Sequence, residues 1–405
     1  MSSATAPLTP GRPLDDATQL GHALDDLLAT RTEPPAVLAL GEPTHGIAAF
    51  PSLRNDILAH LVERGFRSVV LETDHFAASL VDDYIDGADT DLDTVLATGF
   101  THAFGAVPGN RELVTWLRAH NAGRAPADRV RFHGFDAPLD QIETPSPRAA
   151  LTGALAALPA ALRPASAGEL ESLLGADADW SNPAGIYDPD AALGDCARVR
   201  FLRSIADDIA SALRRAAPDL RATAPAAFDR AVADARTAQG VLRYHAAMGS
   251  TAPDRIGTLL SIRAEMMADN LLAIRDAEQD RGPSLVFAHN AHVHRGRSTM
   301  GMGTGDVSWC GAGALVAPAL GARHIVVTTD GAPHSAPGTL QGALAAATTR
   351  RSLFSAASLR ATLPAGTQAG APIVPGHIPL TPADLDGTDA VIFVADTDGT
   401  RHQYW

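Results

Sequence analysis

The sequence predicts an α/β fold, with a largely parallel central sheet flanked by helices and an inserted α-helical subdomain. Three observations support this prediction. Short apolar runs alternate with segments of helical periodicity, which is typical of parallel sheets covered on both faces. Polar side chains directly follow several of these runs. An Ala-rich region, residues 149–280, has helical spacing over most of its length and interrupts the alternation.

Six apolar runs are expected to be the strands, namely residues 36–40, 68–71, 130–135, 284–288, 324–329 and 390–395. Leucine spacing predicts a helix over 15–30 and another from about 53 to a stop at Gly65. Residues 75–85 and 109–120 are also expected to be helical. Within the Ala-rich region, 218–249 and 254–279 could each hold a long helix. Residues 331–385 mix short helices with Pro/Gly loops.

The predicted organisation is a flexible N-terminal arm, residues 1–13, followed by a single catalytic domain over 14–405. Residues 149–280 would be a mostly helical insert or lid in that domain. With 405 residues, 46% of them hydrophobic, the chain is long enough for a large core.

Composition excludes several classes of function. The formal net charge of -14 argues against a nucleic-acid-binding face and against a polybasic membrane anchor. No Sec signal or spanning apolar run is visible, so a cytoplasmic protein is expected. The two cysteines, Cys196 and Cys310, allow no disulfide framework and no CxxC metal motif. Every basic residue is Arg, so no lysine can act as a Schiff-base nucleophile.

Polar side chains follow four of the predicted strands. Glu42 and His45 follow the first strand and Glu72 the second, Asp136 follows the third, and His289 and His292 follow the fourth. Ligands of open α/β sheets bind outside the carboxyl ends of the strands. These four strand ends could therefore converge on one cleft.

Glu42 and His45 are the strongest candidates for acid–base chemistry. A neutral imidazole can take a proton from water near neutral pH, and a neighbouring carboxylate can orient it and stabilise the imidazolium. The alternative is that Glu42 caps the next helix and His45 packs in the turn. No Gly-x-Ser-x-Gly elbow is present, which argues against a serine esterase.

The other candidates also have structural alternatives. Glu72 could cap a helix or pair with an arginine, and Asp136 is better explained as holding a loop or an arginine. His289 and His292 could act as general acid, oxyanion donor or metal ligand, or could be a surface pair. Arg54 and Arg263 are candidate carboxylate binders, for which a structural ion pair is the alternative.

The segment Gly41-Glu42-Pro43-Thr44-His45-Gly46 resembles the GE-x-THG signature of the erythromycin esterase family. Further matching blocks follow in family order between about residues 37 and 330. They are Phe50 and Arg54, then Gly65-Phe66 with Ser68-Val69-Val70-Leu71-Glu72, then Phe132-His133-Gly134-Phe135-Asp136, then Arg263 with Met267-Ala268-Asp269-Asn270, and finally Ala288-His289-Asn290-Ala291-His292-Val293.

The resemblance implies an α/β core whose helical insert forms one wall of a deep cleft. It also implies hydrolysis of an ester or lactone, such as that of a macrolide, by water that the histidine matching His45 activates. By the same resemblance Glu42, Glu72, His289, His292, Arg54 and Arg263 line the cleft. No cofactor or metal is expected. The partner would be a small macrolide or other polyketide-like substrate, and the protein a monomer or homodimer.

Three alternatives remain open at this stage. The same acid–base groups could dehydrate, cyclise or rearrange a polyketide-type natural product. Glu42, His45, Glu72, His289 and His292 include enough nitrogen and oxygen ligands for zinc or manganese. A non-enzymatic haem or ligand binder of the wider superfamily is the third alternative.

Overall fold

The structure is a computed structural model that describes residues 8–140, 144–302, 305–332, 335–397 and 399–402. It divides into two compact units. The first comprises Met1–Phe135 and Leu271–Trp405, and the second comprises Asp136–Asn270. Each unit is described separately below.

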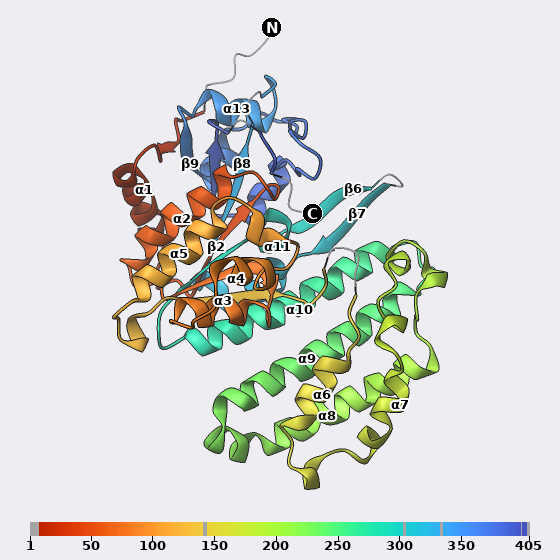
Figure 1. The fold of residues 1–405 in the computed structure, drawn as a ribbon. Coiled ribbons are helices and arrows are strands. Elements are labelled where there is room, and N and C mark those ends of the chain that lie inside the picture. Colours follow the sequence, from red (N-terminus) through yellow and green to blue (C-terminus); the bar gives the residue numbers. More distant parts are fainter. Residues whose placement is uncertain (1–7, 141–143, 303–304, 333–334, 398, 403–405) are drawn as a thin grey trace. The chain divides into compact units, whose positions relative to one another are not determined.

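The first unit is built on a mixed sheet of eight described strands (Figure 1). Their order is β1 (Arg12–Pro13), β9 (Arg351–Ser355), β10 (Ala390–Val394), β8 (His324–Gly331), β2 (Val37–Glu42), β5 (Ser284–His289), β3 (Ser68–Asp74) and β4 (Arg131–Asp136). The run from β10 through β8, β2 and β5 to β3 is parallel. At one side of the sheet, β9 pairs antiparallel with β10, and β1 pairs antiparallel with β9. A largely parallel sheet is therefore confirmed.

Helices pack on this sheet because its strands are apolar on both faces. Leu38, Leu40, Val69, Leu71 and Leu285 project from one face and share a core with α1 to α5. The helices of this unit are α1 (Ala17–Ala29), α2 (Ala49–Val62), α3 (Ala78–Ile85), α4 (Leu92–Thr98), α5 (Asn110–Asn121), α11 (Asn290–Val293), α12 (Ala312–Leu320), α13 (Leu340–Ala346) and α14 (Ala356–Thr362). A separate two-stranded ribbon pairs β6 (Arg297–Met302) with β7 (Gly305–Cys310).

The second unit is helical. It contains α6 (Arg148–Ala156), α7 (Leu170–Leu174), α8 (Ala197–Thr223), α9 (Pro225–Met248) and most of α10 (Arg255–Glu278). Its core combines alanines with a few large side chains, including Trp180 and Phe228. Alanine favours helix formation and its small side chain lets helices pack closely. The roles of this region as a lid and as a wall of a cleft stay predictions.

Short 3-10 segments connect the longer elements. They are Phe104–Ala106, Pro126–Asp128, Ala160–Leu162, Ala165–Glu169, Asp177–Asp179, Pro183–Ile186, Pro189–Ala191, Gly321–Arg323 and Pro382–Gly387.

The structure contains all six predicted strands and corrects three other predictions. The arm is not loose throughout, because Arg12–Pro13 pairs with β9; residues 1–7 lie outside the described residues. The helix predicted over 218–249 begins at Pro225, and Pro218 lies inside α8. Proline is favoured at the first position of a helix, where its missing N–H costs nothing, and Pro225 occupies that position. β9 lies in a region predicted to contain only short helices and loops.

Gly41 allows the end of β2 to approach the turn after β5. A Cβ at this position would lie 2.2 Å from Asn290 Oδ1 and 3.0 Å from Asn290 Cα. The backbone atom cannot move away without shifting the strand end. A side chain at position 41 would therefore disturb both strands.

We expect Gly41→Ala to lower the free energy of unfolding by about 1–3 kcal/mol, because the added methyl overpacks a rigid contact. Urea denaturation of the full chain measures this change. Gly168→Ala is the matched control, since a Cβ there meets no atom within 4 Å, and its effect should stay within about 0.5 kcal/mol. Equal stability losses in the two variants would contradict the steric argument.

Candidate active site

Three neighbouring strands bring the main candidates together. In the sheet, β5 lies between β2 and β3. Glu42 and His289 are the last residues of their strands and pair directly in the β2–β5 register. Glu72 follows Leu71, whose register partner is Phe287. Glu72 was predicted to follow its strand, but β3 continues for two more residues to Asp74.

Glu42 and His45 form a hydrogen-bonded pair across the turn that follows β2. His45 Nδ1 lies 2.8 Å from Glu42 Oε1. The Glu42 side chain is 7% exposed and the His45 side chain 22%, so His45 is the more accessible of the two. Burial raises the pKa of Glu42, while the hydrogen bond from His45 and the charge of Arg54 oppose this rise. A carboxylate here can hold His45 with the proton on Nδ1, which leaves Nε2 as a base.

Glu72 contacts three histidines of the cluster. Its Oε1 lies 3.7 Å from His45 Nε2 and 3.2 Å from His292 Nε2. Its Oε2 accepts a hydrogen bond of 2.8 Å from the backbone N–H of His289. Glu42 and Glu72 therefore face the same imidazole of His45 from its two nitrogens.

His289 bonds the backbone through both ring nitrogens. Its Nε2 donates to the Pro43 carbonyl at 3.0 Å, and its Nδ1 accepts from the Ala291 N–H at 3.1 Å. Burial, with the nearby charge of His45, lowers the pKa of His289 to about 3. In this geometry the imidazole is neutral and holds the turn between Glu42 and His45.

Arg54, a candidate carboxylate binder from the sequence, lies in the interior. Its relative exposure is 0%. Its Nε and Nη2 donate to Asn55 Oδ1 at 3.0 and 2.8 Å, its Nη1 donates to Asn110 Oδ1 at 2.8 Å, and Nη2 also donates to the Gly109 carbonyl at 3.1 Å. Burial lowers the pKa of Arg54 to about 10, so it stays charged at neutral pH.

Asp136 and Arg263 pair with each other within the second unit. Arg263 Nε donates to Asp136 Oδ1 at 2.9 Å, and Arg263 Nη2 bonds the other carboxylate oxygen. Asn270 Nδ2 donates to the Asp136 carbonyl at 3.2 Å. This matches the expectation that Asp136 holds an arginine. Any contribution of either residue to catalysis stays a prediction.

The sequence analysis assigned no role to several residues that support the strand ends and the turn after β2. Asn290 Nδ2 donates to the Thr329 carbonyl at 2.8 Å, which ties the end of β5 to β8. The Ile378 N–H donates to the Pro43 carbonyl at 3.0 Å, and the His402 N–H donates to the Gly46 carbonyl at 2.7 Å. Backbone contacts of this kind leave no signal in a sequence pattern.

The sequence analysis also did not identify Phe104 as a neighbour of His45. Its ring centroid lies 4.7 Å from that of the His45 imidazole, at an interplanar angle of 46°. It follows His102 and Ala103, which both have positive φ angles of 56° and 52° although neither is glycine. Such backbone is costly for residues with a Cβ and often marks functional loops.

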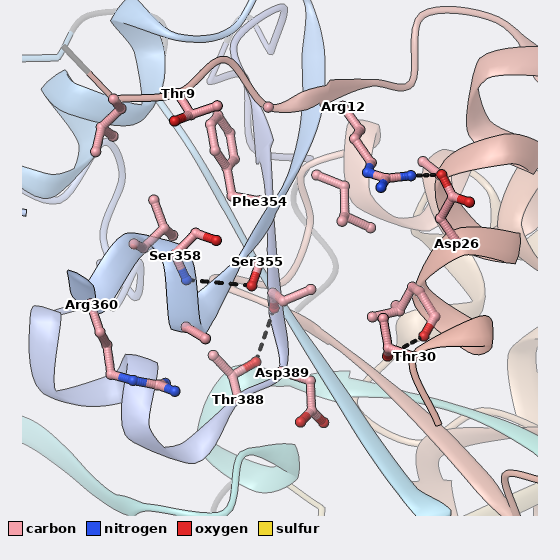
Figure 2. Close-up of a pocket in the computed structure, with 18 of the residues that line it drawn as sticks. Thr9, Arg12, Asp26, Thr30, Phe354, Ser355, Ser358, Arg360, Thr388 and Asp389 are labelled. Atoms are coloured by element: carbon pink, nitrogen blue, oxygen red, sulfur yellow. Dashed lines mark hydrogen bonds and ion pairs between the residues drawn. The ribbon is translucent and has the colours of Figure 1, made fainter. Parts of the chain in front are cut away.

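Two cavities of the first unit differ in position and chemistry. One of about 20 Å³ is lined by Glu42, His45, Arg54, Glu72 and Phe104, among others. The other, of about 490 Å³, lies between α1 and α14 and includes residues 388–390, where β10 begins. Figure 2 shows the Arg12–Asp26 pair on one side of this larger cavity and Ser355 with Ser358 on another. Its lining contains no histidine, whereas His45 and two carboxylates line the smaller cavity, which is the candidate active site.

Among the described residues, no three His, Cys, Asp or Glu side chains are arranged to hold a metal ion. No helix in the same residues is both long and apolar enough to cross a membrane.

Comparison with known proteins gives one family match. The family model described as erythromycin esterase matches residues 61–363. Because the match begins at residue 61, the assignment of Glu42, His45 and Arg54 rests on their geometry. No curated protein matches the sequence significantly.

Solved structures share the fold at low sequence identity. A protein of Bacillus cereus has a TM-score of 0.68 and 16% identity, covering 96% of this chain and 94% of its own. A mutant of the erythromycin esterase EreC in its open conformation has the same TM-score and identity, covering 97% and 98%. A succinoglycan biosynthesis protein has a TM-score of 0.60 and 14% identity, covering 97% and 94%. These likenesses show the fold alone.

The depressed pKa of His289 predicts a pH-dependent stability. Between pH 7 and pH 5 the unfolded imidazole, with a pKa near 6.5, takes up a proton that the folded imidazole, with a pKa of about 3, does not. Acidification should therefore cost about 2 kcal/mol of unfolding free energy through this residue. Urea denaturation at the two pH values measures it.

His289→Gln is the control, because its side chain does not titrate and can still donate to Pro43. The stability loss between pH 7 and pH 5 should be about 2 kcal/mol smaller in this variant. Other buried histidines, such as His245 and His324, contribute equally in both proteins. An unchanged pH dependence would mean that His289 takes up a proton in the folded state.

Proposed function

Because this chain belongs to the erythromycin esterase family, we propose that it hydrolyses the ester or lactone bond of a macrolide-type substrate with water activated by His45. The observation that carries the proposal is the position of His45 between two buried carboxylates, Glu42 on Nδ1 and Glu72 beside Nε2. Family membership supports hydrolase chemistry on macrolides.

His45 acts as the general base. With Nδ1–H donating to Glu42, its Nε2 carries the lone pair that takes the proton from water. Glu42 stabilises the imidazolium that forms, as the acid does in a catalytic triad. Since the His45 side chain is 22% exposed, substrate can reach it, while Glu42 is shielded from solvent.

Glu72 positions the attacking water together with His45. Its Oε1 and His45 Nε2 are both acceptors, and their separation of 3.7 Å lets one water donate a hydrogen bond to each. That water then has its lone pair directed away from both groups. It attacks the ester carbonyl and forms a tetrahedral oxyanion. When this intermediate collapses, the C–O bond to the alkoxide oxygen breaks, and that oxygen takes up a proton to give the alcohol.

We assign protonation of the leaving alkoxide to His292 in preference to His289. Both nitrogens of His289 are bonded to the backbone. His292 Nε2 faces Glu72 at 3.2 Å, and its Nδ1 has no hydrogen-bond partner among the described residues. From this position its imidazole can donate a proton to the alkoxide or stabilise the oxyanion.

The test is turnover of a panel of macrolides followed by mass spectrometry. The expected product is one water heavier than the substrate, and in ¹⁸O-water the new carboxylate carries the label. His45→Asn should lower kcat by roughly 10³-fold or more. The variant loses both the base that takes the proton from water and one of the two acceptors that hold this water.

His60→Gln is the matched control for His45→Asn. His60 also pairs with a carboxylate, with its Nε2 at 2.9 Å from Asp25 Oδ1, but it lies in the last turn of α2. This variant should keep full activity. A product of unchanged mass would favour cyclisation, and a product one water lighter would favour dehydration. Normal turnover by His45→Asn would refute the assigned base.

A further inference from the structure

Asn110 connects two features of the site that are otherwise separate. Its Oδ1 accepts from Arg54 Nη1 at 2.8 Å, and its Nδ2 donates to the Phe104 carbonyl at 2.7 Å. An arginine can only donate and a carbonyl can only accept, so the orientation of the amide is fixed. Asn110 is the first residue of α5 and is 4% exposed.

The arginine that Asn110 holds is a buried charge with neutral partners. Among the described residues, the hydrogen bonds of Arg54 go to two amide oxygens and one backbone carbonyl. Its Cζ lies 4.9 Å from the centroid of the Phe287 ring. Its charge interacts favourably with Glu42 and Glu112. Burying a cation without a direct ion pair is costly. Hydrogen bonds such as the one to Asn110 are therefore needed to hold Arg54 in this position.

The two oxygens of the Glu42 carboxylate differ in their partners. Its Oε1 bonds His45, whereas its Oε2 is buried and has no hydrogen-bond partner among the described residues. Glu42, Arg54 and Asn110 line the same cavity of about 20 Å³. That volume suits one water, which can donate to Glu42 Oε2 and accept from Arg54.

The second partner of Asn110 lies against the other end of the pair. The Phe104 carbonyl accepts from Asn110, and the Phe104 ring packs on the His45 imidazole at 4.7 Å. Moving the amide would therefore affect both the cation near Glu42 and the aromatic ring on His45.

We propose that Asn110 is a positioning residue for the Glu42–His45 pair, holding Arg54 beside Glu42 and Phe104 against His45. The proposal rests on the function assigned to that pair, but its first readout does not require turnover. A carboxylate in place of the amide would pair with Arg54 and neutralise its charge. It would also lose the donor to the Phe104 carbonyl.

The experiment is an NMR titration of the His45 imidazole in the full chain, assigned by comparison with His45→Asn. In Asn110→Asp the pKa of His45 should rise by roughly half a unit or more, because a negative charge is added near the imidazolium. The charged and titratable groups around His45 are Glu42, Glu72, His289, His292, Arg54 and, beyond Phe104, His102. None of these residues is substituted in Asn110→Asp.

Asn121→Asp is the matched control. Asn121 is the last residue of α5, is 3% exposed, and its amide bonds only the backbone of Ile85 and Val130. It lies about 16 Å from Asn110 along the helix axis. This variant should lower the melting temperature without moving the His45 titration. An unmoved titration in folded Asn110→Asp would overturn the proposal.

Two uncharged variants, Asn110→Leu and its control Asn121→Leu, provide a second test in case the aspartate variants do not fold. Asn110→Leu should lower kcat roughly tenfold or more and leave KM within about twofold. The substitution would displace the Glu42–His45 pair, whereas residue 110 does not itself contact substrate. Asn121→Leu should change neither constant. Equal loss of stability in both variants with unchanged kcat would mean that Asn110 is only structural. If no macrolide is hydrolysed, the His45 titration still tests the positioning role.

Discussion

The pairing of β2 with β5 is the constraint on which the candidate site depends. This register places Glu42 opposite His289, and each of these residues leads directly into a turn that carries another histidine, His45 or His292. Because Gly41 has no side chain, the second turn can pack against the end of β2. A shift by one residue would send the two side chains to opposite faces of the sheet. The acid–base geometry is therefore a consequence of main-chain pairing.

The charges of the site are arranged around one imidazole. Two buried carboxylates face the two nitrogens of His45, and the charge of the interior Arg54 acts on Glu42. In the mechanism that we propose, His45 takes a proton between these two carboxylates, so little reorganisation is needed. The neutral His289 holds the backbone of the turn without adding a positive charge that would oppose this protonation.

The sequence predicted those candidate site residues that lie at the ends of strands with a clear apolar pattern. Buried strands have a clear apolar signal, and parallel strands bring their carboxyl ends to one edge, so the grouping of Glu42, His45, Glu72, His289 and His292 could be predicted. β9 was missed because its five residues resemble the loops around it. Asn110 and Phe104 were missed because their importance comes from packing between α2, α5 and the turn after β2, which no local pattern records. Arg54 was identified by its charge, but the sequence did not indicate that its side chain is buried.

The turn that carries His45 is held by backbone groups from a distant part of the chain. The carbonyl oxygens of Pro43 and Gly46 accept hydrogen bonds from Ile378 and His402, more than 330 residues later. During synthesis on a ribosome, the Glu42–His45 segment emerges long before these partners exist. The segment can then have its final geometry only once residue 402 has left the exit tunnel. A chain terminated before these partners are made would therefore carry the Glu42–His45 segment without its support.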